Sequence, residues 1–295
     1  MSKINIKVGI IGGSGLGEAL CGQIEGDRID VDTPFGKPSD AIMQATWDGV
    51  DVAILTRHGK GHTIIPSQVN YRANIYALKA IGCTHVIASG AVGSLREEIR
   101  PKDLVIPDQV IDKTYRREGT FFDKYMAAHV ELALPFCQVL REHLKSCAGA
   151  VSAKVHERGT YVCMEGPAFS TRAESEMHRK WGGDLIGMTC MPEAKLAREA
   201  ELAYAMVCLP SDYDCWRPVR ADLDRHGLLK EIIGNLAEAT ANAIELIKVA
   251  VSRFGEIADH VCPSHSALEL AIWTDRAEIV PEAKEYYGVL VEKYL

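Results

Sequence analysis

The chain has 295 residues, of which 47% are hydrophobic and 25% are charged, a composition typical of a globular protein. A formal net charge of −7 argues against a general nucleic-acid-binding surface, and no apolar run approaches the ~18 residues of a membrane span. There is no signal-peptide pattern at the start, and the nine scattered cysteines show neither a Cys-x-x-Cys pair nor a recognised zinc-ligand motif, which predicts a cytoplasmic protein with reduced thiols and no metal.

The first predicted strand ends in a glycine-rich loop. Residues 8–11 (Val-Gly-Ile-Ile) form the strand, and residues 12–17 (Gly-Gly-Ser-Gly-Leu-Gly) follow it. Backbone N–H groups of such a loop can approach an anion closely, and the Ser14 hydroxyl adds a donor. Glu18 occupies the third glycine position of the dinucleotide fingerprint, which disfavours a dinucleotide or a nucleoside triphosphate. A tight turn without a ligand is the alternative.

A second loop rich in donors follows a predicted hairpin. Residues 41–47 and 50–56 are its strands, and an Asp-Gly dipeptide is its turn. The second strand leads into residues 57–62 (Arg-His-Gly-Lys-Gly-His), where Arg57 and His58 can donate hydrogen bonds to a phosphate. A solvated basic turn is the alternative, but the position at a strand end favours an anion pocket.

A third loop of small residues completes the pattern. Pro66 is expected to begin a helix over residues 67–81, and residues 84–88 are expected to form a strand. The loop after this strand is residues 89–94 (Ser-Gly-Ala-Val-Gly-Ser). Three loops of this kind at neighbouring strand ends predict one composite phosphate site.

The rest of the chain alternates strands with helices, which predicts an α/β fold. We expect one domain over residues 1–251 and a C-terminal extension, residues 252–295, that packs on the same domain. Thr171 and Glu174 form a capping-box pattern at a helix start. The remaining predicted elements are strands at 104–111, 154–164, 184–186 and 202–209, helices at 135–147, 192–202, 224–251 and 281–295, and a long loop at 115–130.

Two carboxylates after the last predicted strand are the candidate catalytic groups. Residues 202–209 lead through a Pro-Ser turn into Asp212 and Asp214. In an open α/β sheet, ligands bind outside the carboxyl ends of the strands. A carboxylate there can accept from an amino group, or carry a proton to a ring nitrogen if burial raises its pKa. The alternative is that Asp212 caps the next segment and Asp214 is solvated.

Phe169 follows another predicted strand end and can stack on a flat ring, although a lone Phe is more often an ordinary core residue.

Together the motifs resemble the S-methyl-5′-thioadenosine phosphorylase family, in the trimeric branch of the purine nucleoside phosphorylase superfamily. The match covers about residues 8–249. It is carried by residues 11–16, 57–59, 62–71, 93–98, 165–167, 170–174, 188–189 and 211–216.

The resemblance implies an α/β fold with a central mixed sheet, a distorted barrel, surrounded by helices. It also implies a homotrimer with no metal and no cofactor, in which inorganic phosphate is a co-substrate. The implied phosphate ligands are Ser14, Arg57, His58, Gly90, Ala91 and Thr189. The implied nucleoside contacts are Phe169 as a wall of the base pocket, Met188 as the ribose floor, Asp212 and Asp214 as purine readers, and His129, which reaches the 5′ pocket of a neighbouring subunit.

Some positions depart from the family pattern. Gly90 stands where relatives often have Thr, so one hydroxyl donor is missing unless Ser89 replaces it. Ser170 stands where 6-oxopurine phosphorylases usually carry Glu, which favours a 6-aminopurine. Gly187 replaces a frequent Asn near the base, and Arg225 replaces a frequent aliphatic residue near the 5′ substituent. These last two positions keep methylthioinosine, adenosine and other purine nucleosides as alternative substrates.

The expected reaction is phosphorolysis of the N-glycosidic bond of S-methyl-5′-thioadenosine, in methionine and purine salvage. Phosphate attacks C1′, adenine leaves, and 5-methylthioribose 1-phosphate forms. Asp212, if partly protonated, donates to N7 of the leaving purine. Two other classes compete. A non-catalytic nucleotide sensor on the same fold is disfavoured by the intact Arg57, His58 and aspartates, and a dehydrogenase is disfavoured by the loop spacing.

Overall fold

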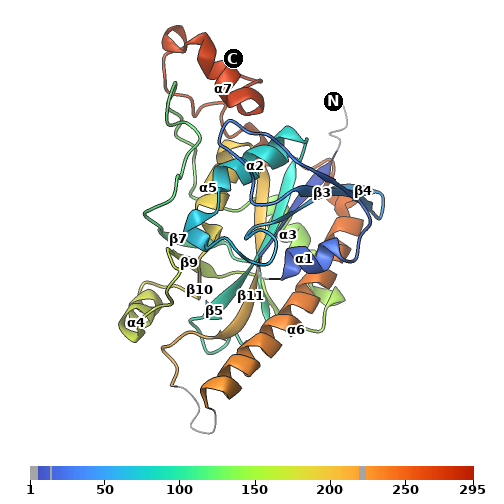
Figure 1. The fold of residues 1–295 in the computed structure, drawn as a ribbon, viewed down its shortest axis with the longest axis vertical. Coiled ribbons are helices and arrows are strands. Elements are labelled where there is room, and N and C mark those ends of the chain that lie inside the picture. The colour runs from blue at the N-terminus through green and yellow to red at the C-terminus, as the bar shows by residue number, and fades with distance from the viewer. Residues whose placement is uncertain (1–5, 14, 219–223) are drawn as a thin grey trace.

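The structure, a computed structural model, describes residues 6–13, 15–218 and 224–295 (Figure 1). Its strands are β1 (Lys7–Gly12), β2 (Asp27–Ile29), β3 (Ile42–Trp47), β4 (Val50–Thr56), β5 (His85–Ser94), β6 (Leu104–Val105), β7 (Gln109–Lys113), β8 (Val155–His156), β9 (Thr160–Met164), β10 (Leu185–Gly187) and β11 (Ala203–Tyr213). Its α-helices are α1 (Leu16–Cys21), α2 (Tyr71–Ala80), α3 (Gln138–Ser146), α4 (Arg172–Lys180), α5 (Cys190–Glu199), α6 (Arg225–Ser252) and α7 (Pro281–Tyr287).

Strand β5 is the centre of a mixed 11-stranded sheet. Its first half pairs in parallel with β1, its second half pairs antiparallel with β10, and its whole length pairs in parallel with β11. From β1 the sheet continues through β4 and β3 to β2, and from β10 it continues through β9 to β7. The sheet therefore branches at β5, and residues from several strands lie next to the second half of that strand.

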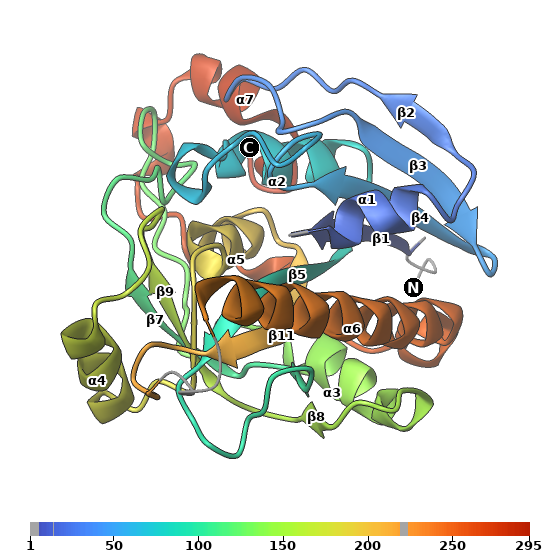
Figure 2. The ribbon, with the colours of Figure 1, turned by 60° about the horizontal axis from the view of Figure 1, so that its bottom comes forward.

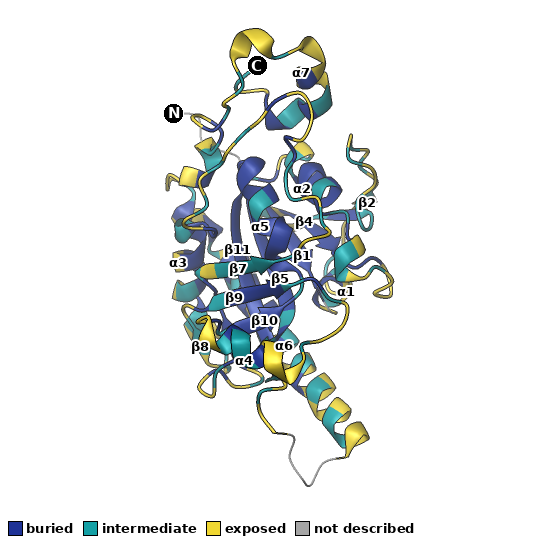
Figure 3. Cartoon of the chain, turned by 90° about the vertical axis from the view of Figure 1, so that its left-hand side faces the viewer, coloured by how far each residue is buried: buried dark blue, intermediate teal, exposed yellow. Residues whose placement is uncertain are grey.

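Helices cover both faces of the sheet (Figure 2). Helices α2, α5 and α7 contribute to the core on one face, and α1, α3 and α6 contribute to the core on the other. Because both faces are covered, β11 is apolar along most of its length, and the strands at the centre are buried (Figure 3). Alternate residues of β11 serve the two cores, with Tyr204, Met206 and Cys208 in the first and Ala203, Ala205, Val207 and Leu209 in the second.

Side-chain caps fix where helices begin. Thr171 and Glu174 form the predicted capping box at the start of α4. The predicted helix at 67–81 is shorter than expected, because the Asn70 side chain accepts a hydrogen bond from the Ala73 N–H at 3.1 Å and starts α2 there. The preceding Pro-Ser-Gln segment forms a separate 3-10 turn.

Several predicted boundaries are wrong. The segments 104–111 and 154–164 each contain two short strands rather than one. Residues 89–94 are not a loop, because β5 continues through them in register with β11. The predicted helix at 281–295 is interrupted where Gly288 adopts a φ of 49°, a left-handed conformation that ends α7.

The C-terminal extension packs against the domain. Leu268, Ala271, Tyr287 and Leu290 are buried in the same core as α2 and α5. None of the helices in the described ranges is long and apolar enough to cross a membrane.

A buried carboxyl at the end of α5 gives the fold a pH dependence. Glu199 is 5% exposed and accepts hydrogen bonds from the Thr120 hydroxyl at 2.8 Å and the Phe121 N–H at 2.7 Å. Burial raises the pKa of Glu199 from 4.5 to about 7 despite these bonds. The folded protein therefore binds this proton more tightly than the unfolded chain does. The stabilising contribution is complete below pH 4.5 and is lost as the pH rises through about 7.

We expect Glu199→Gln to flatten this dependence, because glutamine stays neutral, keeps one acceptor oxygen for the Phe121 N–H and can donate its amide to the Thr120 hydroxyl. The gain in the free energy of unfolding at pH 8 should be on the order of 2 kcal/mol, measured by chemical unfolding at pH 5 and pH 8. Glu282→Gln, at an exposed position, serves as the control. An unchanged pH profile in Glu199→Gln would show that this carboxyl does not titrate as described.

Candidate active site

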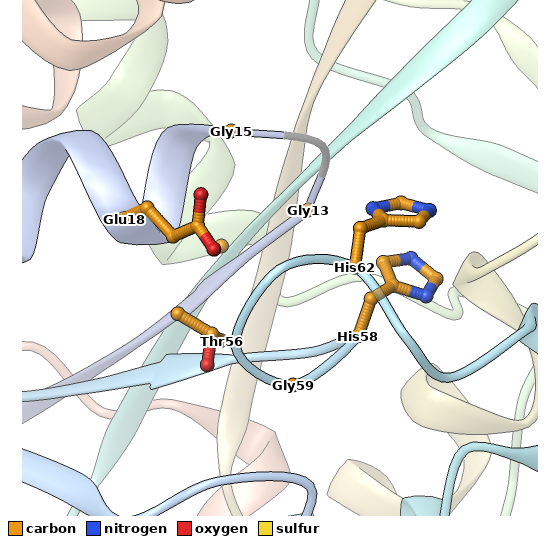
Figure 4. A pocket seen from close by; sticks show the side chains of 8 residues that line it. Gly13, Gly15, Glu18, Thr56, His58, Gly59 and His62 are labelled. Carbon is orange, nitrogen blue, oxygen red and sulfur yellow. The ribbon is translucent and has the colours of Figure 1, made fainter.

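The loops after β1 and β4 face each other across a small pocket (Figure 4). The Arg57 N–H donates to the Gly12 carbonyl at 2.9 Å, and the Gly61 N–H donates to Glu18 Oε1 at 2.9 Å. These bonds hold together two segments that are far apart in the sequence. The pocket is lined by Gly12, Gly13, Gly15, Glu18, Thr56, His58, Gly59 and His62.

Arg57, between the pocket-lining residues Thr56 and His58 in the sequence, is fully buried in an ion pair. Its Nε and Nη2 donate to the two carboxylate oxygens of Glu193 at 2.7 and 2.8 Å, and its Nη1 donates to the Ser89 carbonyl at 2.7 Å. Burial alone would lower the pKa of Arg57, but the pairing with Glu193 outweighs burial and raises it above its ordinary value. The guanidinium is therefore permanently charged, and its geometry is fixed by a bidentate partner.

Glycine at position 13 lets the first loop approach this guanidinium. A Cβ at Gly13 would lie 2.9 Å from Arg57 Nη1 and 2.8 Å from the Ser89 carbonyl oxygen. Thr189 comes in from the other side, since a Cβ at Gly90 would lie 3.1 Å from the Thr189 hydroxyl. The structure thus brings together Arg57, Gly90 and Thr189 of the predicted phosphate ligands. Ser14 lies outside the described residues.

His58 is a neutral donor–acceptor at the same pocket. A carbonyl can only accept, so its 2.8 Å contact with the Ile64 carbonyl assigns the proton to Nδ1 and leaves a lone pair on Nε2. Burial and the neighbouring Arg57 lower the pKa of His58 to about 4. Its ring stacks on that of His62 at a centroid distance of 4.3 Å. At neutral pH, His58 therefore adds hydrogen-bonding capacity but no charge.

Asp212, in β11, and Asp214, just after it, lie beside the C-terminal end of β5. A register shift in β11 between Pro210 and Asp212 sets Asp212 opposite Gly93, and the Asp214 N–H donates to the Ser94 carbonyl at 3.0 Å. The predicted turn after Leu209 is therefore wrong, because β11 continues through it with a bulge. Bulges of this kind re-aim side chains next to ligand sites.

Both aspartates have the surroundings of functional carboxylates. Burial raises the pKa of Asp212, with the negative charge of Asp214 adding to the effect, while the Ser211 hydroxyl donates to Asp212 Oδ1 at 2.8 Å. Asp214 is 8% exposed, so it is not solvated. The residue that caps the next described helix is Asp224 rather than Asp212. The alternative, in which Asp212 caps the next segment and Asp214 is solvated, is therefore wrong.

Strand β5 links the two ends of the site. Gly90 lies at the cationic end, whereas Gly93 and Ser94 contact the aspartates. At a rise of about 3.3 Å per residue, Gly90 and Gly93 lie roughly 10 Å apart along the strand.

The residues predicted to contact the base and the ribose lie on loops outside β5. Phe169 is 85% exposed, so it is not a core residue. The thioether of Met188 packs on the loop after β9, where a Cβ at Gly166 would lie 2.5 Å from its sulfur. The half-buried Ser170 donates to Met164 Sδ at 3.7 Å.

Gly187 is explained by its neighbour Tyr161. A Cβ on Gly187 would lie 2.0 Å from the Tyr161 hydroxyl oxygen, which also accepts the Thr189 N–H at 3.3 Å. The fully buried Tyr161 therefore occupies the space that an asparagine at position 187 would need. We infer that this tyrosine positions the backbone of Thr189 in the phosphate site.

We expect Gly187→Asn to destabilise the protein by at least about 2 kcal/mol, because the new side chain overpacks a rigid ring. Adding Tyr161→Ala should recover part of this loss by opening space. The measurement is the free energy of unfolding of both single variants and the double variant, analysed as a cycle. Additive losses would contradict a direct clash between the two positions.

His129 and Arg225 stand apart from the pocket within one chain. The exposed His129 ring meets Trp273 edge-on at a centroid distance of 4.9 Å. Arg225 is the exposed first residue of α6, whose first turns project from the body of the protein (Figure 3). Among the described residues, neither side chain has a contact with the pocket. Both remain predictions.

Sequence reasoning missed three groups that organise the site. Glu193 neutralises Arg57 and also accepts from the Tyr204 hydroxyl at 2.8 Å. Arg117, in the predicted 115–130 loop, donates to the Met188 carbonyl at 2.6 Å and to Glu165 Oε1 at 3.0 Å. A glutamate within an otherwise apolar helix pattern was the available signal for Glu193.

A third missed group is a buried histidine. His178, on the buried face of α4, accepts from Lys113 Nζ through Nε2 at 3.3 Å. A lysine can only donate, so this contact assigns the remaining ring proton to Nδ1. Burial and Lys113 lower the pKa of His178, while the negative charge of Asp214 opposes this shift.

Comparisons with known proteins agree with this geometry. A family model described as "Phosphorylase superfamily" matches residues 7–252. The S-methyl-5′-thioadenosine phosphorylase of Geobacter sulfurreducens is 47% identical over 98% of this chain and 99% of its own, and that of Gloeobacter violaceus is 43% identical over 100% and 98%.

Solved structures give the same result. A methylthioadenosine phosphorylase from an antarctic soil metagenomic library superposes with a TM-score of 0.86 at 42% identity, over 98% of this chain and 99% of that one. Methylthioadenosine phosphorylase from Schistosoma mansoni in complex with tubercidin gives a TM-score of 0.79 at 38% identity, over 85% and 92%. The chain has the glycine-rich loop, the buried ion pair and the paired aspartates close to β5. The matches above show that it belongs to the phosphorylase superfamily and, within it, to the S-methyl-5′-thioadenosine phosphorylase family.

Proposed function

We propose that this chain is a pentosyltransferase that cleaves S-methyl-5′-thioadenosine with phosphate, giving adenine and 5-methylthioribose 1-phosphate for purine and methionine salvage. The observation that carries the proposal is the arrangement along β5. A buried cation with hydroxyl and backbone donors stands at one end, near Gly90, and the half-buried Asp212 and the buried Asp214 stand at the other, beside Gly93 and Ser94. Relatives named for this activity support it.

The cationic end is proposed to hold the phosphate. Because Glu193 neutralises Arg57, local donors rather than net charge hold the anion. They are the free N–H bonds of Arg57, the Thr189 hydroxyl, Ser14, and the backbone around Ala91. His58 carries a lone pair on Nε2, so it suits the P–OH group of hydrogen phosphate, which can donate to it. No metal or organic cofactor is needed for these contacts.

The carboxylate end is proposed to read the purine. Asp214 accepts from the 6-amino group, and a protonated Asp212 donates to N7 as negative charge develops on the leaving base. The raised pKa of Asp212 favours its proton-carrying form. Ser170 places no carboxylate beside the base, which favours a 6-aminopurine over a 6-oxopurine. Met188 and Phe169 are proposed to contact ribose and base.

We also propose a cytoplasmic homotrimer. Around His129, the large apolar side chains Leu270 and Trp273 are 89% and 73% exposed, and the His129 N–H donates to the Ala271 carbonyl between them at 2.8 Å. Such a patch suits a subunit interface, through which His129 would reach a neighbour's 5′ pocket. A monomer in sedimentation-velocity measurements at micromolar concentration would contradict this assembly.

A substrate panel tests the function. Release of free base is measured for S-methyl-5′-thioadenosine, methylthioinosine, adenosine and inosine, each with and without phosphate. We expect phosphate-dependent release, fastest for S-methyl-5′-thioadenosine. A higher kcat/KM for adenosine would indicate that the exposed Arg225 turns toward a polar 5′ group. Base release that is independent of phosphate, or no release from any nucleoside, would contradict the proposed reaction.

A further inference from the structure

A cluster of thiol and imidazole groups lies outside the active site. His85 begins β5. In the C-terminal extension, Cys262 directly precedes the 3-10 turn Pro263–Ser266, and His265 lies within that turn. One ligand atom from each of the three residues lies within 4.8 Å of the others. His85 Nε2 and Cys262 Sγ are 3.7 Å apart. A tetrahedral zinc ion with Zn–S of about 2.3 Å and Zn–N of about 2.0–2.1 Å separates such atoms by roughly 3.6 Å.

Hydrogen bonds from outside the cluster orient both imidazoles. The Thr84 hydroxyl donates to the Lys7 carbonyl at 3.4 Å, so it accepts the Nδ1–H of His85 at 2.9 Å and leaves Nε2 unprotonated toward Cys262. The Thr84 carbonyl accepts Nε2–H from His265 at 3.0 Å, so Nδ1 of that ring keeps its lone pair. Partners of this kind are what fixes the tautomer of a metal-binding histidine.

The cluster lies in the interior of the fold. His85 and Cys262 are 3% and 2% exposed. Cys137 packs in the same hydrophobic core cluster as Cys262. Cys137 precedes α3 and is 3% exposed. It is the candidate fourth ligand.

The surroundings allow a cation to enter. His265 is only half-buried, which leaves an approach from the surface. Lys293, which donates to the His265 carbonyl at 2.8 Å, is also paired with Glu201 at 2.6 Å. Two thiolates would balance the charge of one divalent ion.

We propose that His85, Cys262 and His265, with Cys137 as the fourth ligand, form a structural site for a borderline divalent metal of the zinc type. The site would tie the C-terminal extension to the start of β5 and to α3. It departs from the expectation of no metal, because the ligands come from three segments that only the fold brings together. The reaction itself does not use it.

The test uses the full, reduced chain after treatment with a chelator. We expect one equivalent of Zn²⁺ per chain in equilibrium dialysis, and a thermal midpoint that rises by several degrees when Zn²⁺ is added. With Co²⁺ as the probe, a thiolate-to-metal charge-transfer band should appear. Cys262→Ser and His265→Asn should each weaken binding at least tenfold, and Cys262→Ser should reduce the band.

Cys83→Ser is the matched control, because Cys83 is equally buried, has a pKa raised to about 12 by burial and lies outside the cluster. It should bind like the parent chain. Circular dichroism identifies any variant that fails to fold, and the half-buried His265 gives a second variant whose folding is least at risk. Absence of stoichiometric binding by the parent chain, or equal binding and an equal spectrum in folded Cys262→Ser, would overturn the proposal.

Discussion

Asp212→Ala is expected to lower kcat for phosphorolysis by about 10²–10⁴-fold while the chain keeps its fold. The alanine removes the group that we propose stabilises the leaving purine, and it removes a carboxylate whose burial is unfavourable for its charged form. The free energy of unfolding should therefore change little. Steady-state kinetics with S-methyl-5′-thioadenosine and saturating phosphate measure the first effect, and chemical unfolding measures the second.

Two variants sharpen this test. Asp30→Ala, at an exposed position, controls for the loss of one negative charge and should retain full activity. Asp212→Asn keeps a hydrogen-bond donor for N7 without a proton to transfer, so it should retain more activity than the alanine variant. Near-normal kcat in folded Asp212→Ala would show that the leaving-group role is wrong.

Glu193→Ala should be the most destabilising of these substitutions. It leaves the fully buried guanidinium of Arg57 without its bidentate partner, and removing one member of a buried pair typically costs about 3–5 kcal/mol. It should also raise the KM for phosphate, because the guanidinium is no longer held against Gly13 and Ser89. Urea unfolding and phosphate-dependent kinetics measure the two effects.

The double variant Arg57→Met with Glu193→Leu separates stability from function. Replacing both charges with apolar side chains removes the uncompensated cation, so the double variant should be more stable than Glu193→Ala. It should nevertheless be at least as inactive, since no cation remains at the phosphate end. Recovery of activity in the double variant would mean that Arg57 has only a structural role.

Much of the fold could be predicted because local signals agreed with the tertiary structure. The hairpin around Asp48 and Gly49 forms as expected, with positive φ angles of 48° and 80° at these two residues. The capping box at Thr171 is also confirmed. The prediction of secondary structure was wrong where pairing between strands decided the conformation against the local amino-acid composition. Small residues after Ala88 suggest a loop, yet the register with β11 keeps them in a strand.

The candidate site was less predictable, and the reason is geometric. Motif matches could indicate Arg57, Thr189 and Asp212 as candidates, but not the partners that decide their charge. Glu193 lies 136 residues from Arg57 in the sequence, and Tyr161 fills the space beside Gly187 from a different strand. Contacts of this kind follow from the branching of the sheet at β5, which no local pattern encodes.

The central claim is that the second half of β5 joins a phosphate subsite to a purine subsite. A crystal structure of the chain with phosphate and adenine tests it most directly. We predict phosphate oxygens within hydrogen-bonding distance of Arg57 and Thr189, and the purine's N7 and 6-amino group on Asp212 and Asp214. Adenine bound away from both aspartates, or phosphate bound away from Arg57, would contradict the account.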